Sequence, residues 1–398
     1  MRRLHRYVFH IDVNSAFLSW SAIKQLKQDP DSVDLRTVPS AVCGDKEARH
    51  GIILARSTEA KKYGVTTPEP IVQALRKCPG LILVQPDFEW YTYCSRQLRE
   101  LLNGYTDQLI PFSIDEAWAV FEGYENLYGD PVEFAYRLKD EIKEKLGFTV
   151  NIGISTNFLL SKMAGDFSKP DKVHSCFPEE IKTKMWPLPV GDLLFCGKSS
   201  AERLMSIGIR TIGQLACAED TLLLTVMKKQ GMVLKNYANG ADIDLNDMDC
   251  ARKSYSHSFT TPKDISDLDE AKQILLSLTE TLAARLREDN ATARCISINF
   301  TTSDFRKISR QKTLDRKTNI TKEIYRNVCV LADELWTTDM SVRLLGVGAS
   351  GTDEEDDGQI SLFDNEEREK QTSCDNAMDA IRKKYGTEAI KRASLLEK

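Results

Sequence analysis

The chain has 398 residues, a formal net charge of −5 and a pI near 5.8. This length provides for about two to four domains, and the overall charge does not by itself indicate a nucleic-acid binder. The ten cysteines include no Cys-x-x-Cys pair, which argues against a zinc cluster or a disulfide framework and favours buried thiols in a reducing cytosol. No apolar run approaches the roughly eighteen residues of a membrane span. We therefore expect a soluble, cytoplasmic protein.

The first half of the chain has the mixed periodicity of an α+β protein. We predict strands at 7–13, near 36–43, at 51–56 and at 149–154, and helices at 15–28, 57–63, 88–104, 131–146 and 155–167. Gly64 and Gly147 directly follow two of these helices, and a glycine in the left-handed conformation commonly ends a helix.

Two short segments about a hundred residues apart combine an apolar strand pattern with acids. The first is Tyr7–Asn14, which contains Asp12, and the second is Ile110–Trp118, which contains Asp115 and Glu116. A carboxylate at the end of a buried strand loses several kcal/mol of hydration unless a cation or a donor meets it. If these acids converge, they also repel one another.

A divalent cation solves both problems, because Mg²⁺ prefers oxygen ligands and leaves positions for substrate phosphates. The expected chemistry is two-metal phosphoryl transfer. Other interpretations stay open at this point: Asp12 suits a turn or a cap, and Ser113 with Glu116 suits a helix capping box. The residues that follow, Ala117–Phe121, are β-like, so we favour a strand–turn–strand hairpin that carries the acids.

From about residue 178 the pattern changes to short helices, and a polar linker then leads to a separate C-terminal unit. We predict helices at 179–185, 190–194, 199–207, 211–217 and 219–228, and a linker at 241–251. Strands at 254–259, 294–302, 306–314 and 342–348 and helices at 267–288 and 320–336 follow. This order indicates a sheet with two helices on one face. Disorder is expected at 351–372, which is acidic, before a final helix at 374–385.

Several motifs, in order and at compatible spacing, resemble those of the Y-family DNA polymerases, the translesion group. They are Ile11–Asn14, Ala55–Val65, Ser113–Ala117, Asn151–Asn157 with Lys169–Pro170, and Gly197–Lys198 with Gly208–Ile209. The C-terminal unit also looks like the little-finger domain of that family, through Ser303–Arg306 and Arg343–Val347. The resemblance covers roughly residues 7–348.

The resemblance implies an α+β multidomain fold, a right-handed polymerase with palm, small fingers, helical thumb and α/β little finger. The implied boundaries are 1–15 and 86–176 for the palm, 16–85 for the fingers, 177–245 for the thumb and 252–348 for the little finger. Residues 349–398 form an acidic tail with the terminal helix. Because no stretch of suitable length remains for a proofreading exonuclease, error-prone synthesis is expected.

The resemblance also assigns the metal ligands. Asp12, Asp115 and Glu116 match the metal-binding, catalytic acids of the family, and the carbonyl of Val13 is a further ligand for two Mg²⁺ ions. Asn14 stands where many relatives carry a second Asp. That pattern leans towards the catalytic subunit of bacterial polymerase V rather than towards polymerase IV.

Four residues match positions that contact the incoming nucleotide: Phe17, Thr58, Lys61 and Lys169. Phe17 matches an aromatic gate that excludes a 2′-hydroxyl by steric clash, although a core position on a helix is the alternative. Thr58 and Lys61 replace the Tyr and Arg of many relatives, so they supply a hydroxyl and a point charge rather than a bidentate fork. Lys169 matches a lysine that reaches the triphosphate; a surface lysine at a helix end is the alternative.

Two segments are candidates for contacts with DNA phosphates. Gly197, Lys198 and Ser199 resemble the turn of a helix-hairpin-helix, whose backbone N–H groups bind phosphate without reading sequence. Phe195 replaces the usual first glycine of that turn, and a plain helix pair is the alternative. The basic run that includes Arg306, Lys307, Arg310 and Lys312 favours a duplex-phosphate track over a solvated edge strand.

A short peptide in the acidic tail, Gln359–Phe363, resembles the sliding-clamp binding peptide of bacterial polymerases. In that peptide Gln359 and the apolar pair Leu362 and Phe363 would enter a preformed pocket of the clamp β subunit. Tethering to the clamp would raise the local concentration of the enzyme at the primer end.

The sequence therefore predicts a monomeric DNA-directed DNA polymerase that binds primer–template DNA, deoxynucleoside triphosphates and the sliding clamp, and no membrane. It would copy damaged templates with low fidelity. A non-catalytic DNA-binding or clamp-binding accessory protein with a degenerate palm is one alternative. A nucleotidyl cyclase, which can share a palm-like sheet, is another.

Overall fold

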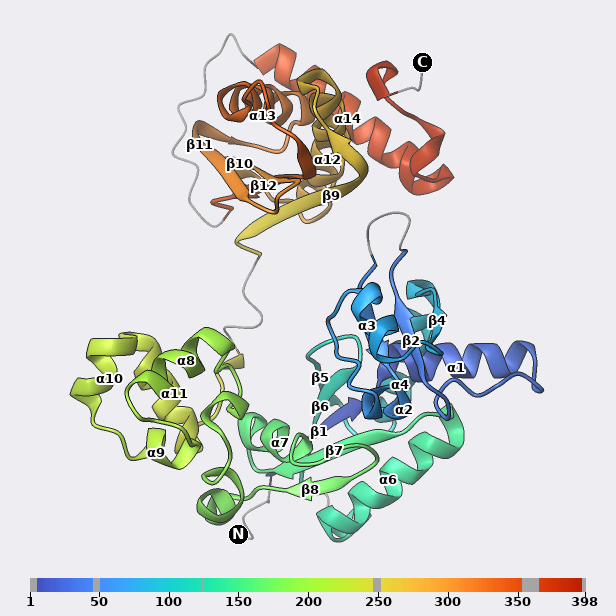
Figure 1. Cartoon of the computed structure of the whole chain (residues 1–398), viewed down its shortest axis with the longest axis vertical. Helices are drawn as coiled ribbons and strands as arrows, with labels where there is room; N and C mark the ends of the chain where they lie inside the picture. Colours follow the sequence, from blue (N-terminus) through green and yellow to red (C-terminus); the bar gives the residue numbers. More distant parts are fainter. Residues whose placement is uncertain (1–5, 46–50, 124, 246–251, 353–364, 396–398) are drawn as a thin grey trace. The chain divides into compact units, whose positions relative to one another are not determined.

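The computed structural model describes residues 6–45, 51–123, 125–245, 252–352 and 365–395. These residues form two compact units, one built from the described residues up to Leu245 and the other from those after residue 251 (Figure 1). Within these ranges no helix is long and apolar enough to cross a membrane.

A five-stranded sheet with the order β5–β6–β1–β7–β8 forms the centre of the first unit. Its strands are β1 (Arg6–Val13), β5 (Gln108–Pro111), β6 (Glu116–Glu122), β7 (Val150–Ser155) and β8 (Val173–Ser175). β1 pairs antiparallel with both β6 and β7, and β5 pairs antiparallel with β6, so the predicted acidic hairpin is confirmed. Because β1 is central, all of its residues from Val8 to Val13 are buried, as expected for a strand covered on both faces.

Each face of this sheet contacts a different hydrophobic core. Phe9 and Ile11 point to a core shared with α1 (Ala16–Gln28), α4 (Phe88–Asn103) and α6 (Pro131–Leu146). Helix α6 ends at Gly147, whose φ of 80° confirms the predicted left-handed C-cap. On the opposite face lie Val8 and, by the alternation of a strand, Asp12.

Helix α7 (Phe158–Gly165) covers the face that carries Val8 and packs directly on the backbone of the sheet. A Cβ atom on Gly153 of β7 would lie 1.9 Å from the carbonyl oxygen of Ser161 in this helix. The absence of a side chain at Gly153 therefore permits the close approach of α7, which brings Lys162, the residue after Ser161, to Glu116 at the start of β6.

A three-stranded sheet in the order β3–β2–β4 lies beside α1 in the same unit (Figure 1). It consists of β2 (Ser40–Cys43), β3 (Ile53–Arg56) and β4 (Ile82–Val84), with α2 (Thr58–Lys62) and α3 (Ile71–Lys77). Gly64 has a φ of 77° after α2, as predicted. Neither α3 nor β4 was predicted from the sequence, because their short lengths leave too few residues for a clear period.

Short helices follow from residue 178, as predicted, and share one core with the Val8 face of the sheet. They are η1 (Pro178–Glu180), η2 (Ile181–Met185), η3 (Val190–Asp192), α8 (Lys198–Ser206), α9 (Ile212–Ala216), α10 (Asp220–Met227) and α11 (Lys229–Ala238). Helix α11 was not predicted, because Lys228 and Gly231 suggest a helix end. In the fold, a Cβ on Gly231 would lie 2.8 Å from the Cβ of Met227, so this glycine serves close packing between two helices.

The second unit contains an antiparallel four-stranded sheet in the order β11–β10–β12–β9. Its elements are β9 (Ser254–Ile265), α12 (Leu268–Glu288), β10 (Ala293–Thr302), β11 (Lys307–Thr318), α13 (Thr321–Leu335) and β12 (Val342–Ser350). Ile296, Ile298 and Phe300 are fully buried in the core with both helices. The predicted split α/β unit is confirmed, although β9 and β11 are longer than expected.

The C-terminal helix α14 (Asn365–Tyr385) begins earlier than predicted, so the expected disorder is wrong for residues 365–372. Its charged residues, whose composition suggested disorder, form ion pairs with oppositely charged residues of the preceding fold. Asp375 and Asp379 bind Arg287 of α12 at 3.3 and 2.6 Å, and Arg368 binds Glu323 of α13 at 2.8 Å. Long-range ion pairs of this kind cannot be seen in a local composition.

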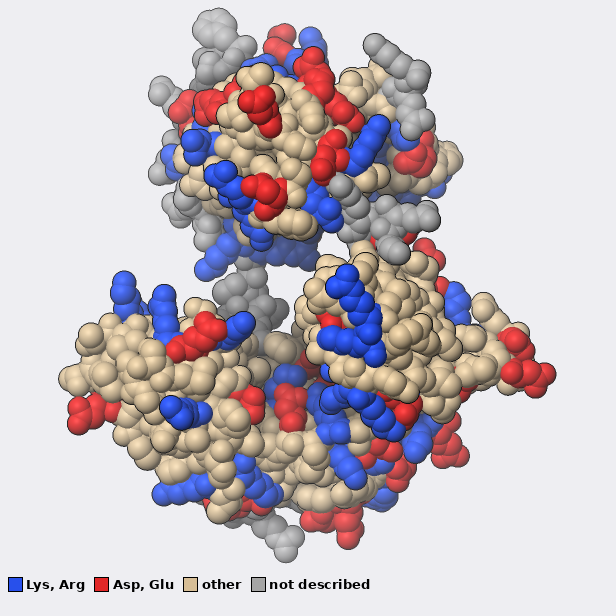
Figure 2. Space-filling model, in the orientation of Figure 1, with Lys and Arg blue, Asp and Glu red and all other residues tan. Residues whose placement is uncertain are grey.

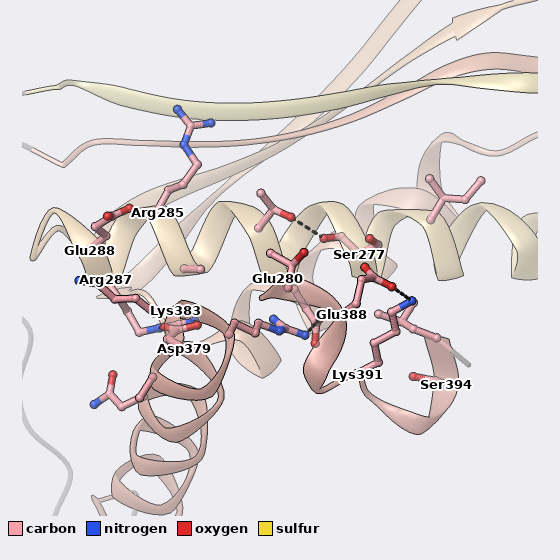
Figure 3. A pocket seen from close by; sticks show the side chains of 18 of the residues that line it. Ser277, Glu280, Arg285, Arg287, Glu288, Asp379, Lys383, Glu388, Lys391 and Ser394 are labelled. Atoms are coloured by element: carbon pink, nitrogen blue, oxygen red, sulfur yellow. Dashed lines mark hydrogen bonds and ion pairs between the residues drawn. The ribbon is translucent and has the colours of Figure 1, made fainter. Parts of the chain in front are cut away.

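Ion pairs also hold the segment after α14 against α12 around a cavity of about 950 Å³ (Figure 3). Glu280 of α12, whose side chain is 8% exposed, binds Arg382 at 2.9 Å and Arg392 at 2.6 Å. Figure 3 shows Glu280 pointing towards the C-terminal segment and Arg287 beside Asp379. The terminal helix thus packs back on its own unit, an arrangement that the sequence had left open.

We expect Arg392→Ala to loosen this C-terminal segment. Arg392 also binds Asp375 at 2.9 Å, so its removal deprives two buried acids of one partner each. The free energy of local opening should fall by about 1 kcal/mol, measured as faster amide hydrogen exchange in α14. Lys391→Ala, which removes a contact to the exposed Glu388, is the matched control. Equal exchange in both variants would contradict the assignment.

Candidate active site

A pocket of about 450 Å³ in the first unit brings together residues that are distant in the sequence. The end of β1, the start of α1, the β3–α2 connection and the Lys169–Pro170 segment line it. The predicted site residues in its wall are Asp12, Val13, Phe17, Thr58, Lys61, Asp115 and Lys169. The structure therefore places seven predicted residues around one space.

The pairing of β1 with β6 brings the acids together. Asp12 lies opposite Glu116 in the ladder, and the N–H of Val13 donates to the carbonyl of Asp115 at 3.1 Å. Asp12 is 7% exposed. Burial raises the pKa of Asp12 to about 6, although the ammonium group of Lys169 opposes this rise. A buried acid with a raised pKa needs positive charge beside it to stay ionised at neutral pH.

Glu116 is held by two basic side chains of the same face. Its Oε2 atom lies 3.0 Å from Nε2 of the buried His10 and contacts Nζ of Lys162 in α7. Burial alone would raise the pKa of Glu116, but the hydrogen bond from His10 and the charge of Lys162 lower it to about 2. Glu116 is therefore ionised and fixed in position at the start of β6. Neither His10 nor Lys162 was predicted as a site residue from the sequence.

The oxygen donors at this edge fit a divalent cation by their chemistry. Asp12, Asp115 and the carbonyl of Val13 line the same pocket, and Mg²⁺ binds carboxylate and carbonyl oxygens together with phosphates. In the conformation described, Lys169 contacts Asp12 and also lies 2.8 Å from Asp166. Within the described residues, no group of three His, Cys, Asp or Glu side chains is arranged as a complete metal site. A bound metal would thus require Lys169 to leave Asp12.

Asn14 has a structural role that explains an amide at this position. Its side-chain Nδ2 donates to Asn151 Oδ1 at 3.0 Å, and its Oδ1 accepts from the backbone N–H of Asp171 at 2.9 Å. A carboxylate could accept the second bond but could not donate the first. Asn14 therefore ties the end of β1 to β7 and to the segment that carries Lys169.

Phe17 lies in the pocket wall as part of an aromatic cluster. Its ring stacks on Tyr91 with centroids 4.7 Å apart and meets Phe88 edge-on at 5.9 Å. These contacts fix the ring plane, so Phe17 is both a packed residue and a pocket residue.

Thr58 and Lys61 reach the same pocket from α2. The side chain of Ser57 caps this helix by accepting from the N–H of Ala60 at 2.9 Å. Arg56, at the end of β3, also lines the pocket. Arg56 was not predicted as a site residue, although its place two positions before Thr58 in the Ala55–Val65 motif could have identified it.

The predicted DNA-contact residues lie in both units. Gly197, Lys198 and Ser199 form the start of α8, and Lys198 is 91% exposed. In the second unit Lys307 lies opposite Thr301 on the face of the sheet without helices. Arg310 and Lys312 instead lie opposite the core residues Ile298 and Ile296, so they point to the other face.

The basic residues of this run therefore do not all lie on one face of the sheet. Arg310 and Lys312 are exposed because β11 is an edge strand. Figure 2 shows Lys and Arg side chains gathered below β10 and β12 on the second unit. The predicted clamp residues Gln359, Leu362 and Phe363 lie outside the described residues.

Comparison with known proteins agrees with the predicted family. The model of the impB/mucB/samB family matches residues 11–166, and the model of its C-terminal domain matches residues 252–362. DNA polymerase IV of Clostridium acetobutylicum is 42% identical over 99% of both chains. DNA polymerase IV 1 of Bacillus subtilis is 35% identical over 99% of this chain and 94% of that protein.

Solved structures show the same fold. The Y-family DNA polymerase chimera Dbh-Dpo4(243-245)-Dbh has a TM-score of 0.73 at 23% identity. The match covers 88% of this chain and 100% of the chimera. An insertion ternary complex of Dbh DNA polymerase has a TM-score of 0.55 at 22% identity, with 86% and 98% covered. The predicted fold class, an α+β multidomain right-handed polymerase, is confirmed.

Asn14 had favoured a relationship to the catalytic subunit of polymerase V. These relatives bear the name DNA polymerase IV, so they do not support that interpretation. The structural role of Asn14 accounts for that residue without a change of subfamily. Since a relative of 42% identity spans 99% of both chains and the family models match both units, this chain belongs to the impB/mucB/samB family, the Y family of DNA polymerases.

Proposed function

We propose that this polymerase performs error-prone synthesis past damaged template bases by two-metal nucleotidyl transfer, without proofreading. The observation that carries the proposal is the pocket in which Asp12, Asp115, Phe17 and Lys169 meet. It combines oxygen donors for cations, an aromatic wall and lysines suited to phosphates. We further propose that the enzyme acts in the cytoplasm, in association with the nucleoid.

In this proposal Asp12, Asp115, Glu116 and the carbonyl of Val13 hold two Mg²⁺ ions. When bound, the metals would activate the primer 3′-hydroxyl and neutralise the triphosphate. His10 and Lys162 keep Glu116 ionised and oriented. Lys169, which now contacts Asp12, would transfer its contact to the triphosphate, because a phosphate offers it a stronger partner once a metal has taken the carboxylate.

The remaining pocket residues would bind the nucleotide. Thr58 and Lys61 would contact the triphosphate from α2, and Phe17 would lie beneath the sugar. We retain the boundaries 1–15 and 86–176 for the palm, 16–85 for the fingers, 177–245 for the thumb and 252–348 for the little finger. The metal and nucleotide sites then lie where palm and fingers meet.

DNA would be bound without sequence preference, through Gly197–Ser199 of the thumb and Arg306, Lys307, Arg310 and Lys312 of the little finger. Gln359, Leu362 and Phe363 would bind the sliding clamp, and the enzyme would act as a monomer. Within the tail 349–398, this peptide would be followed by α14. The ion pairs of Arg287 hold α14 on the little finger.

The deciding experiment is primer extension with Mg²⁺ and four deoxynucleotides on undamaged and damaged templates, with and without the clamp. Extension past the lesion that the clamp increases is the expected result. A mismatched primer end should remain uncleaved, since no proofreading is proposed. An inert enzyme under all conditions would favour the accessory-protein alternative.

We expect Lys198→Ala to weaken binding to DNA of any sequence by a similar factor. Lys198 stands at the start of α8 and is 91% exposed, so it is available to a phosphate. The slope of log affinity against log salt should decrease in magnitude by about 1, measured by fluorescence anisotropy from low to moderate salt. Lys229→Ala, at the start of α11, is the control. An unchanged slope in the Lys198 variant would contradict the phosphate contact.

A further inference from the structure

The turn between β10 and β11 contains an unusual residue, Phe305. Its backbone has a φ of 65°, and its side chain is among the most exposed large apolar ones, at 69%. A bulky residue is unfavourable in the left-handed region, where hairpin turns normally place Gly, Asn or Asp. Because the ring is exposed, burial of its apolar surface does not offset this unfavourable backbone energy. A residue that is strained and exposed at once suggests a role outside the fold.

Hydrogen bonds hold the turn in this shape independently of the ring. The N–H of Phe305 donates to the carbonyl of Thr302 at 2.9 Å, and the N–H of Thr302 donates to the carbonyl of Arg306 at 2.9 Å. The hydroxyl of Thr302 also contacts Asp304 Oδ1 and accepts from the N–H of Arg306 at 3.1 Å. Because all of these bonds use backbone atoms or other side chains, glycine at position 305 would preserve the turn.

The surroundings of the ring are positively charged. The guanidinium of Arg343 lies over the ring, 5.1 Å from its centroid. The next two residues, Arg306 and Lys307, are exposed. The nearest acid in sequence, Asp304, already contacts the hydroxyl of Thr302. An exposed aromatic ring among cations is the combination with which proteins bind single-stranded nucleic acid: bases stack on the ring and phosphates meet the cations.

We propose that Phe305 stacks on an unpaired base of the template strand, while Arg306 and Lys307 contact the adjoining phosphates. Single-stranded template is the partner, because bases within a duplex are already stacked on one another and their faces are not available. This inference rests on the proposed function as a template-copying polymerase. It adds a template contact on the little finger that is separate from the nucleotide pocket.

The test compares two DNA ligands in fluorescence anisotropy without nucleotide. One is a primer–template with a single-stranded 5′ template overhang, and the other is a blunt duplex of the same paired length. The variants are Phe305→Gly and Phe305→Leu in the full chain. Tyr385→Leu is the matched control, because Tyr385 in the same unit is 66% exposed and carries the ammonium of Lys384 at 5.1 Å from its ring.

Phe305→Gly should lose about tenfold in affinity for the overhang DNA and keep its affinity for the blunt duplex. Its thermal midpoint should equal or exceed that of the wild type, because glycine suits the backbone at this turn. Phe305→Leu should also bind the overhang more weakly, since leucine keeps the apolar surface but not the flat ring. Tyr385→Leu should bind both DNAs as the wild type does.

Three results would overturn the inference. They are an equal loss of affinity for both DNAs, no loss of affinity for either DNA, or a thermal midpoint of Phe305→Gly so much lower that unfolding explains its weaker binding. Primer extension by the wild type is measured alongside. If the wild type fails to extend a primer, the proposed function fails; the binding comparison needs no catalysis and still decides the role of Phe305.

Discussion

Replacing Asp115 by alanine is expected to lower the rate of primer extension by on the order of 10³-fold or more, because metal ligands contribute several kcal/mol to stabilising the charge that develops in nucleotidyl transfer. Asp115 lines the candidate pocket together with Asp12. Its carboxylate accepts from the hydroxyl of Ser113 at 2.5 Å, a bond that leaves further lone pairs for a cation. The rate is measured under single-turnover conditions with saturating Mg²⁺.

Asp107→Ala is the matched control for this change. Asp107 is exposed and lies just before β5, outside the residues that line the pocket. The Asp107→Ala substitution removes the same charge from the same unit, so a general electrostatic effect would appear in both variants. Equal activity of the Asp115 variant and the wild type would remove the metal assignment.

Replacing Phe17 by alanine is expected to reduce the preference for deoxynucleotides over ribonucleotides by roughly a hundredfold, the scale on which a shaped pocket discriminates between small groups. The ring lines the pocket and its plane is fixed by Tyr91 and Phe88. Removing it should open space for a 2′-hydroxyl. The measured quantity is the ratio of kcat/KM for each deoxynucleotide to that for its ribonucleotide counterpart.

Phe88→Ala is the control for the aromatic cluster. Phe88 contacts the Phe17 ring edge-on but does not line the pocket. Both substitutions weaken the same cluster, so a loss of selectivity caused by loosened packing would appear in both. The steric gate is supported only if ribonucleotide use rises in the Phe17 variant while Phe88→Ala stays near wild type.

The acidic pocket could be predicted from the sequence to a large extent, because its information is local. Asp12 lies near the end of β1, Asp115 lies in the turn after β5, and Glu116 begins β6, so the antiparallel pairing of β1 with β6 brings these positions together. The motif around Thr58 and Lys61 likewise carries its own cap, because the side chain of the adjacent Ser57 caps the short helix. Helix ends at Gly64 and Gly147 depend on a single backbone conformation, which glycine adopts readily.

Only the tertiary structure decided what depends on contacts between distant residues. His10 reaches Glu116 because β1 pairs with β6, and Lys162 reaches it because Gly153 lets α7 lie on the sheet. Lys169 reaches Asp12 across 157 positions of sequence. Helix α14 is ordered from Asn365 because Asp375 and Asp379 meet Arg287 of α12, and because its own Arg368 meets Glu323 of α13.

The sequence also could not predict which face of the sheet each basic side chain of this run occupies. The pairing of β11 with β10 determines that Lys307 faces one side and Arg310 the other, since a shift of one residue in register reverses every side chain. The sequence therefore determined the strands, the acids and the family of this polymerase. Which charges meet those acids, and which surfaces remain free for DNA, depended on packing between segments that no local pattern connects.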